Sequence, residues 1–321
     1  MPSRDGVVKF GTLRHSQRLF PPRAAMRSQA LRADLLMLIT AMIWGAAFVA
    51  QRVGMNDIGP FLYSGLRFAL GALVLLPLLL YRSAGGTLGP LLNRGLLLGG
   101  ALMGLVLAIG INFQQVGLLF TSVTNSGFIT GLYVIMVPLF GLLIGQRTGL
   151  GTWLGAMLAV LGMFLLSVGE NFQVAPGDWL QLAGACVWGV HVLLVGFLAR
   201  RYDPIRLAFL QFVTCALISL ALALIFEEYQ LAAIVRAAPA LLYGGIAAVG
   251  IGFTLQVVAQ KHAIASHAAI ILSLEAVFAA LAGALLLDET LQLRGYLGCG
   301  LMFAGMLVAQ LWPKKGEVQT A

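Results

Sequence analysis

Two charged residues, Arg67 and Glu275, lie well inside long apolar stretches, at 60–81 and 265–287. A charge at membrane depth costs at least about 2.5–3.5 kcal/mol, so each residue needs a physical reason to be there. At about 1.5 Å per residue, Arg67 lies about 10 Å and Glu275 about 15 Å into its segment. We consider a structural ion pair, a ligand contact for one or both, and snorkelling of Arg67 to the interface. As ligand contacts, Glu275 would receive a proton or an amine, and Arg67 a carboxylate.

A second set of candidate residues is uncharged. Trp44 and Trp188 each precede a glycine in mid-segment, although membrane tryptophans usually lie at the headgroup level. His191 follows Trp188 by three residues, on the same helical face. Each polar residue alone could form an interhelical hydrogen bond, but together they predict a polar cavity with tryptophan walls. The remaining polar candidates are Asn112, Gln114, Gln115, Asn125, Thr130, Tyr133, Gln211, Thr254, Gln256 and Ser273.

The composition is that of a polytopic membrane protein. Of the 321 residues 60% are hydrophobic and only 10% charged, with a mean hydropathy of +0.94, whereas soluble domains have about 25% charged residues. The net charge of +8 is spread among loops, which argues against nucleic-acid binding. Cys186, Cys215 and Cys299 lie in apolar runs without metal-type spacing, so we predict no metal site and no cofactor.

Ten segments are long and apolar enough to be membrane-spanning helices, which predicts an all-α polytopic protein. Residues 169–177 form a linker between a first five-helix repeat at 32–168 and a second at 178–312. Residues 1–31 form a basic tail without a predicted fold, and residues 313–321 form a second tail. Both Met1 and Met26 are candidate translation starts. The ten segments are 33–52, 60–81, 95–117, 122–145, 150–168, 179–199, 204–226, 239–260, 265–287 and 293–312.

The distribution of basic residues predicts that both termini are cytoplasmic. With ten spans, the tails and every second loop share one side, and these carry most of the lysine and arginine residues. The other side has only Arg52, Arg236 and Arg294. Because short cytoplasmic loops are enriched in Lys and Arg, the basic side faces the cytoplasm.

The first half of the chain recurs faintly in the second. Ala41, Trp44, Gly45, Pro60, Phe68, Ala72 and Leu73 are matched 144 residues later. Leu154, Gly155, Gly162 and Met163 are matched 143 residues later. Gln114 corresponds to Gln256, but Arg67 corresponds to Gln211 and Tyr133 to Glu275, so the charged positions break the repeat. Because each copy has five predicted spans, the copies should be inverted, an arrangement typical of secondary transporters.

Several motifs resemble those of the EamA-type drug/metabolite transporters. They are the Trp-Gly pairs, Leu66-Arg67-Phe68, the stretch 124–138, and Ser273-Leu-Glu-Ala-Val-Phe with Leu-Leu-Leu-Asp-Glu-Thr-Leu at 285–291. Such families often have proline after the glutamate, and Ala276 in its place argues against a helix break there. Gln146 stands where an acidic residue commonly ends the fourth span, whereas Asp288-Glu289 retains it. The resemblance implies export or exchange of small metabolites, such as amino acids, across a bacterial inner membrane.

The sequence therefore predicts a secondary transporter of a small, amino-acid-like metabolite that works by alternating access. Its partners would be the lipid bilayer, a small-molecule substrate and protons, and its oligomeric state is left open. The alternatives are a channel-like pore, a membrane sensor and an intramembrane enzyme. An enzyme is disfavoured because no nucleophile–base set can be placed together. The sequence has no phosphate-binding Gly-x-x-x-x-Gly-Lys-Ser/Thr loop.

Overall fold

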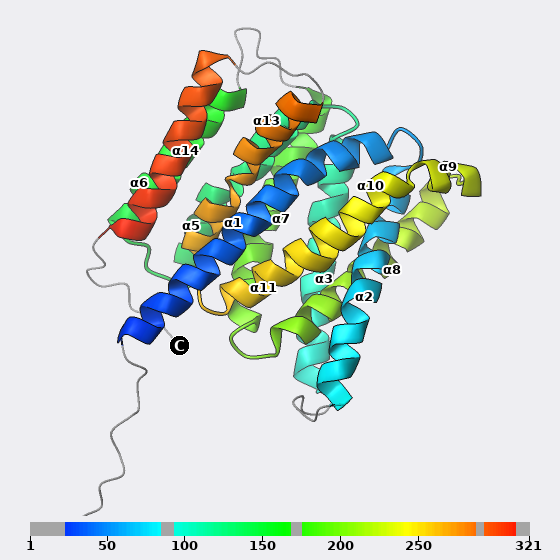
Figure 1. Cartoon of the computed structure of the whole chain (residues 1–321), viewed down its shortest axis with the longest axis horizontal. Helices are drawn as coiled ribbons and strands as arrows, with labels where there is room; N and C mark the ends of the chain where they lie inside the picture. The colour runs from blue at the N-terminus through cyan, green and yellow to red at the C-terminus, as the bar shows by residue number, and fades with distance from the viewer. Residues whose placement is uncertain (1–22, 85–92, 168–174, 287–291, 313–321) are drawn as a thin grey trace, which may run out of the picture.

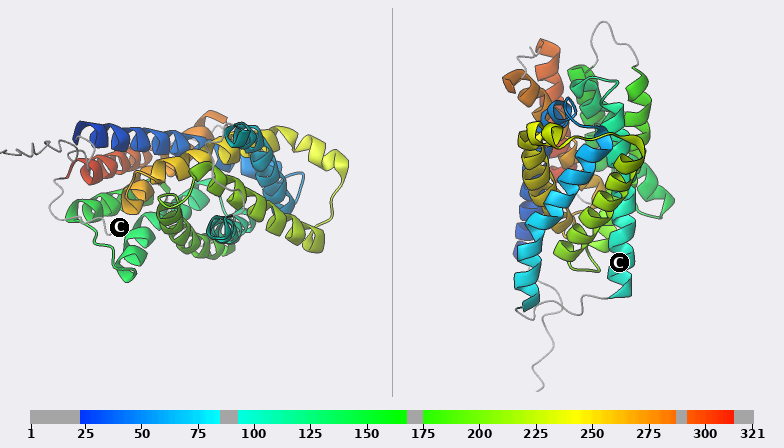
Figure 2. Two further views of the ribbon diagram at one scale, coloured as in Figure 1. Left: turned by 90° about the horizontal axis from the view of Figure 1, so that it is seen from below. Right: turned by 90° about the vertical axis from the view of Figure 1, so that its right-hand side faces the viewer.

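The computed structural model describes residues 23–84, 93–167, 175–286 and 292–312, and within these ranges every regular element is a helix (Figure 1). The axes of most of the long helices are roughly aligned, and these helices lie side by side (Figure 2, right). Residues 1–22 of the tail predicted at 1–31, the whole tail predicted at 313–321, most of the predicted linker, and Asp288-Glu289 lie outside the described residues.

The first half of the chain contains α1 to α6 and the second half α7 to α14. The bounds in the first half are α1 Arg23–Gly54, α2 Pro60–Ala84, α3 Arg94–Gly117, α4 Val123–Gly131, α5 Tyr133–Leu143 and α6 Leu150–Ser167. Those in the second half are α7 Pro176–Leu198, α8 Pro204–Phe226, α9 Leu231–Arg236, α10 Ala238–Leu242, the π-helix η1 Tyr243–Phe253, α11 Thr254–Gln260, α12 Ala265–Leu272, α13 Glu275–Leu286 and α14 Leu293–Leu311.

Eight helical stretches in the described part of the chain are long and apolar enough to cross a membrane. They coincide with eight of the ten predicted spans. The span predicted at 150–168 is a shorter apolar helix, Leu150–Leu165, and the one predicted at 293–312 is helical but is not among the eight. At the N-terminus, α1 already begins at Arg23, ahead of the boundary predicted at residue 32, in a stretch rich in alanine and other good helix formers.

Two of the long stretches are interrupted at corresponding positions of the two halves. Helix α4 gives way to α5 at Leu132, immediately before Tyr133. Helix α12 gives way to α13 at Ser273 and Leu274, immediately before Glu275. The repeat-related residues Tyr133 and Glu275 are therefore each the first residue of a new helix. Discontinuous helices of this kind are a frequent feature of binding sites in membrane transporters.

The interruption before Glu275 corrects the expectation that Ala276, in place of proline, leaves this helix unbroken. The amides of Leu274, Ala276 and Val277 each donate to the carbonyl three residues earlier, which tightens the turn. The Ser273 hydroxyl also donates to Ile270 O at 2.9 Å and so competes with the helical bonds. A serine and a short 3₁₀-type turn thus produce the break without proline.

The helix contacts that join the two halves occur in repeat-related pairs. Helix α3 packs on α7, and the corresponding stretch of the second half, η1 with α11, packs on α1. In the same way, α3 packs on α8, and η1 packs on α2. Helix α13 packs on α1 as α5 packs on α7. The corresponding helices α2 and α8 pack on each other, as do α6 and α14 at one edge of the bundle (Figure 1).

Repeat-related glycines make these close approaches possible. A Cβ added at Gly155 or at Gly305 would lie 2.6 Å from the carbonyl oxygen of the other, and one at Gly162 would lie 2.5 Å from Gly298 O. Similarly, Gly45 lies against Phe278, and Gly189 lies against Met136. In lipid, where there is no hydrophobic drive between helices, small residues permit the backbone contacts that hold them together.

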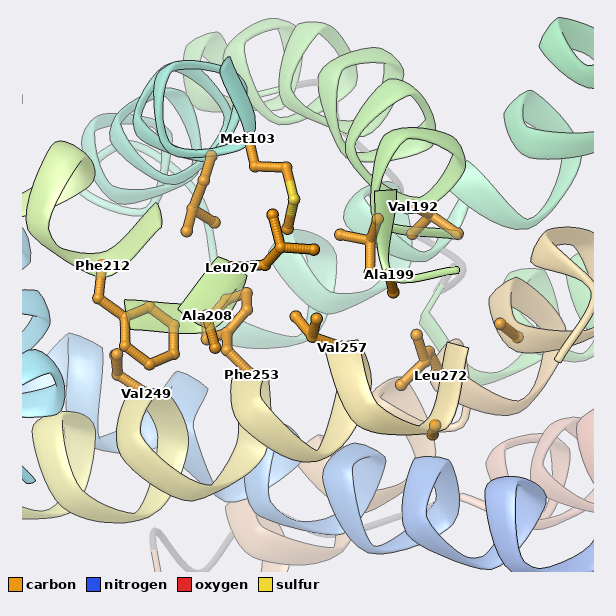
Figure 3. Packing of buried hydrophobic residues seen from close by; sticks show 14 of the residues in the cluster. Met103, Val192, Ala199, Leu207, Ala208, Phe212, Val249, Phe253, Val257 and Leu272 are labelled. Carbon is orange, nitrogen blue, oxygen red and sulfur yellow. The ribbon is translucent and has the colours of Figure 1, made fainter. Parts of the chain in front are cut away.

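The main core cluster lies where α3, α7, α8, η1 and α11 meet. Phe212 on α8 extends toward Val249 on η1, and Leu207 on α8 extends toward Met103 on α3 (Figure 3). Phe253 also contacts Phe68 of α2, with ring centroids 5.6 Å apart. This aromatic cluster fixes the position of η1 against both halves of the bundle.

The glycine contacts give a stability prediction. Gly305→Ala should destabilise the protein by about 1–3 kcal/mol, because the new methyl group meets the backbone of α6 and the helices must separate. Thermal unfolding of the purified protein in detergent measures the effect.

Gly300→Ala on the same helix is the matched control, since a Cβ there meets nothing within 4 Å. It should leave stability unchanged or raise it by up to about 1 kcal/mol, from helix propensity. Equal effects of the two substitutions would contradict the assigned packing of α6 on α14.

Candidate binding cavity

A cavity with about 480 Å³ of empty space, a volume that includes open solvent, lies between the two halves of the bundle. Side chains from α1, α2 and α3 line it together with side chains from α7, η1, α11 and α13, and the α4–α5 stretch also contributes. The lining residues are Trp44, Ala47, Phe48, Gln51, Arg67, Ile111, Gln114, Thr130, Tyr133, Trp188, Val192, Ala248, Phe253, Gln256, Leu272 and Glu275.

Three aromatic rings form one wall of the cavity. Trp44 and Trp188 lie 6.5 Å apart between ring centroids, and Phe253 lies 4.5 Å from Trp44 and 6.0 Å from Trp188. The Trp188 and Phe253 rings are stacked, with 20° between their planes. This wall offers flat apolar surfaces and π faces that attract a cation.

The two tryptophans differ in their indole N–H groups. Trp44 Nε1 donates to Ala248 O of η1 at 3.1 Å, whereas the buried Nε1 of Trp188 has no hydrogen-bond partner. Each indole lies next to a repeat-related glycine: Gly252 for Trp44 and Gly110 for Trp188. The packing is therefore kept between the halves, but the hydrogen bond is not.

Arg67 extends from α2 into the cavity and is 2% exposed. Its Nη2 donates to Gln115 Oε1 of α3 at 3.3 Å. The guanidinium carbon lies 5.2 Å from the ring centroid of Tyr63 and 5.4 Å from that of Phe68. These contacts orient the guanidinium, but none of them supplies a negative charge.

Glu275 lies on the opposite half of the bundle, at the start of α13, and is 4% exposed. Its carboxyl group lies beside the hydroxyl of its repeat mate Tyr133, which forms no hydrogen bond of ordinary geometry. Other acidic residues cap helices: Asp203 accepts from the first amides of α8, and Glu227 from those of α2. Glu275 differs because it faces the cavity.

Arg67 and Glu275 line the same cavity without forming an ion pair. The salt bridges found between described residues join Arg82 to Asp203 and Arg236 to Asp57. A cationic and an acidic side chain thus face one cavity, and they form no ion pair within 4 Å of each other. Since an uncompensated buried charge is costly, this arrangement favours a ligand that carries both complementary charges.

Amide side chains add neutral hydrogen-bonding groups to the cavity. Both the nitrogen and the oxygen of the fully buried Gln256 amide lack partners, and so does Gln51 Oε1. Gln114, the repeat mate of Gln256, and Thr130 also line the cavity. Unpartnered buried amide groups are rare in folded proteins and commonly bind water or ligand.

Eight of the predicted site residues line the cavity: Trp44, Arg67, Gln114, Thr130, Tyr133, Trp188, Gln256 and Glu275. The other seven lie elsewhere. His191 and Gln211 are joined at 3.1 Å, His191 standing edge-on to the Trp188 ring. Asn112 Nδ2 donates to Ala108 O and Ser219 Oγ, and Asn125 lies at the start of α4. Gln115, Thr254 and Ser273 are buried outside the lining.

Sequence reasoning did not single out Gln51, Phe48 and Phe253, which also line the cavity. Gln51 lies one helical turn beyond Phe48 and two beyond Trp44, so the helical period from Trp44 could have identified both. Phe253 lies in an apolar run, and no feature of that run distinguishes it from core residues.

The two ends of the bundle are held differently. Where α1 and α3 end, Arg52 Nη1 donates to Leu118 O at 2.6 Å, and the cavity extends toward this end through Gln51 and Gln114. At the other end, Gln260 Nε2 donates to Val192 O at 2.9 Å and joins α11 directly to α7. No cluster of three or more potential metal-ligating residues occurs in the ranges that the structure describes.

Comparison with known proteins identifies relatives of this chain in sequence and in fold. An uncharacterized transporter of Archaeoglobus fulgidus is 30% identical over 283 residues, covering 88% of this chain and 86% of the relative. A protein of Streptantibioticus cattleyicolor named "probable terminal-alkyne amino-acid exporter" is 26% identical over 183 residues, 55% of this chain and 59% of its own. A crystal structure with 21% identity superposes with a TM-score of 0.72, covering 88% of this chain and 99% of the other, and so has the same fold.

The sequence also matches the EamA-like transporter family twice, over residues 31–168 and 175–310. The two matches correspond to the two halves of the structure, which are joined by repeat-related pairs of helix contacts. The chain therefore belongs to the EamA-like transporter family and is a membrane transporter with several membrane-spanning helices.

Proposed function

We propose that the chain is a secondary transporter that exports or exchanges a small, amino-acid-like zwitterion across a bacterial inner membrane. The observation that carries this proposal is the presence of Arg67 and Glu275 in one cavity without an ion pair between them. A molecule with one carboxylate and one ammonium group would neutralise both.

The two ends of such a substrate would bind by different interactions. A carboxylate matches the planar, forked donors of the Arg67 guanidinium, and charge-assisted bonds of this type contribute about 1.5–3 kcal/mol each. The ammonium group would approach Glu275 and the faces of Trp44 and Trp188, where cation–π attraction adds about 0.5–2 kcal/mol. An apolar side chain would contact the remaining aromatic surface.

We further propose alternating access between two inverted five-helix repeats, with ten spans when α6 and α14 are included. Two features support this topology: the repeat-related pairs of helix contacts between the halves, and the corresponding helix breaks before Tyr133 and Glu275. In an inverted pair, equivalent contacts lie at opposite faces of the membrane. Rocking of the halves would therefore open the cavity alternately at two ends: the end marked by the Arg52–Leu118 bond and the end marked by the Gln260–Val192 bond.

The relatives support the substrate class and leave the coupling to experiment. The Streptantibioticus relative is named for an amino-acid substrate, and a zwitterion fits the charges in the cavity. We propose that Glu275 carries the coupling proton in the absence of the ammonium group. Arg67 and Tyr133 are the other ionisable groups that line the cavity.

The transport role of Glu275 is tested with Glu275→Gln in proteoliposomes. Flux of an amino-acid substrate driven by a pH gradient should fall at least about tenfold, because the amide can neither carry a proton nor pair with an ammonium group. Glu228→Gln, which changes an exposed glutamate, is the control and should leave flux unchanged.

Undiminished proton-driven flux in Glu275→Gln would contradict the role given to Glu275. Counterflow with wild-type protein separates a carrier from a pore. A carrier accumulates labelled substrate against unlabelled substrate, with saturation, whereas a pore lets the label equilibrate.

The inverted topology is tested with single cysteines in a variant that lacks Cys186, Cys215 and Cys299. Exposed positions give two repeat-related pairs, Asn56 with Arg200 and Ala84 with Glu228. A membrane-impermeant thiol reagent added to intact cells should label cysteines at 56 and 228, and label those at 84 and 200 only after lysis. Labelling of both members of a pair from the same side would overturn the inversion.

A further inference from the structure

Arg67 has the surroundings of a cation without an internal counter-ion. It is buried, its hydrogen bond goes to the neutral amide of Gln115, and its ring contacts are to Tyr63 and Phe68. Among the described residues, no carboxylate oxygen lies within 4 Å of the guanidinium. A buried cation requires a nearby anion or extensive hydrogen bonding to offset its desolvation, and one neutral acceptor is a weak substitute.

The unpartnered polar atoms next to Arg67 are mainly hydrogen-bond donors. Arg67 Nε and Gln115 Nε2 are both buried without a partner. Gln115 Nε2 belongs to the same amide group whose Oε1 accepts from Arg67 Nη2, so both donors flank this hydrogen bond. Ser64 Oγ is also buried and unpartnered, one helical turn before Arg67 on the same face of α2.

This set of groups selects an anion over a cation. A guanidinium N–H and an amide NH₂ can only donate, and a serine hydroxyl can donate by rotation. The unpartnered acceptor Asn112 Oδ1 lies almost one turn earlier on α3, on a side chain whose nitrogen bonds to Ser219 of α8. Donors on α2 and α3 thus surround a fixed positive charge, and ionised acceptors form the strongest bonds with such donors.

We propose that Arg67, Gln115 and Ser64 form an anion site between α2 and α3. The site binds the substrate's carboxylate during transport, and it binds a small inorganic anion, such as chloride, when that carboxylate is absent. The carboxylate half of this statement rests on the proposed function, but the chloride half does not. Chloride and substrate then compete, so chloride weakens substrate binding while it stabilises the unloaded protein.

Thermal unfolding of the full-length protein in detergent tests the site without transport. At constant ionic strength, chloride or acetate replaces lactobionate, a bulky disaccharide acid that serves as the reference anion. A ligand that binds the folded state raises the unfolding temperature with its concentration. We expect chloride and acetate each to raise the midpoint by a few degrees, with saturation, relative to lactobionate.

Substitutions at Gln115 make the test specific. Gln115→Glu places a carboxylate where the amide accepts from Arg67, so a built-in counter-ion should abolish the chloride-dependent shift. Gln115→Met removes the donor without adding charge, and should raise the half-saturating chloride concentration at least about tenfold. Glu228→Gln, which changes charge on an exposed residue, should respond to chloride as the wild type does.

The outcomes separate this inference from the proposed function. A chloride shift that disappears in Gln115→Glu supports the anion site, even if no solute shows counterflow. A wild-type midpoint that is equal in chloride, acetate and lactobionate overturns the site, even if counterflow is saturable. A chloride shift of the same size in wild type, Gln115→Glu and Gln115→Met overturns it as well, because chloride then binds elsewhere. If Gln115→Glu does not fold, the comparison with Gln115→Met decides.

Discussion

Burial of a cationic and an acidic side chain that do not pair with each other is the constraint on which this structure depends. Arg67 and Glu275 lie in different halves of the bundle and face one cavity without a salt bridge. An uncompensated charge in a helix bundle costs several kcal/mol, and direct pairing would remove much of that cost. The fold instead holds Arg67 against Gln115 and Glu275 beside Tyr133, which leaves both charges accessible to a ligand.

The architecture of the bundle explains how the two charges are kept in place. Close glycine contacts bring the halves together, and the Phe68–Phe212–Phe253 cluster fixes η1 beside the cavity. The helix break at Ser273 makes Glu275 the first residue of α13. The corresponding break makes Tyr133 the first residue of α5, so the repeat sets the position while the residue type sets the chemistry. The same division holds for Trp44 and Trp188, which share their packing but not their hydrogen bond.

The helices, the duplication and eight of the cavity residues were predictable from sequence, because apolar segments, repeat spacing and intramembrane charges are local signals. We predicted that His191 and Gln211 would lie with the cavity residues, but they form a hydrogen bond with each other, and His191 is edge-on to Trp188. This contact joins two helices, so the spacing of residues along one helix could not predict it. Phe253 could not be identified because it lies in an apolar run that does not distinguish it from core residues, whereas Gln51 could have been found from the helical period that begins at Trp44. The break before Glu275 arises from a serine and short-range hydrogen bonds instead of proline, so the absence of proline was misleading.

The central claim is that one cavity recognises both ends of a zwitterion. The most direct measurement is competition by three matched compounds for saturable binding to the purified protein: an apolar amino acid, its amide, and the acid that lacks the amino group. The account predicts that the amino acid binds best and that loss of either charged group weakens binding at least about tenfold, which corresponds to about 1.4 kcal/mol. Equal binding of all three compounds would contradict it, because the charges of Arg67 and Glu275 would then contribute nothing to recognition.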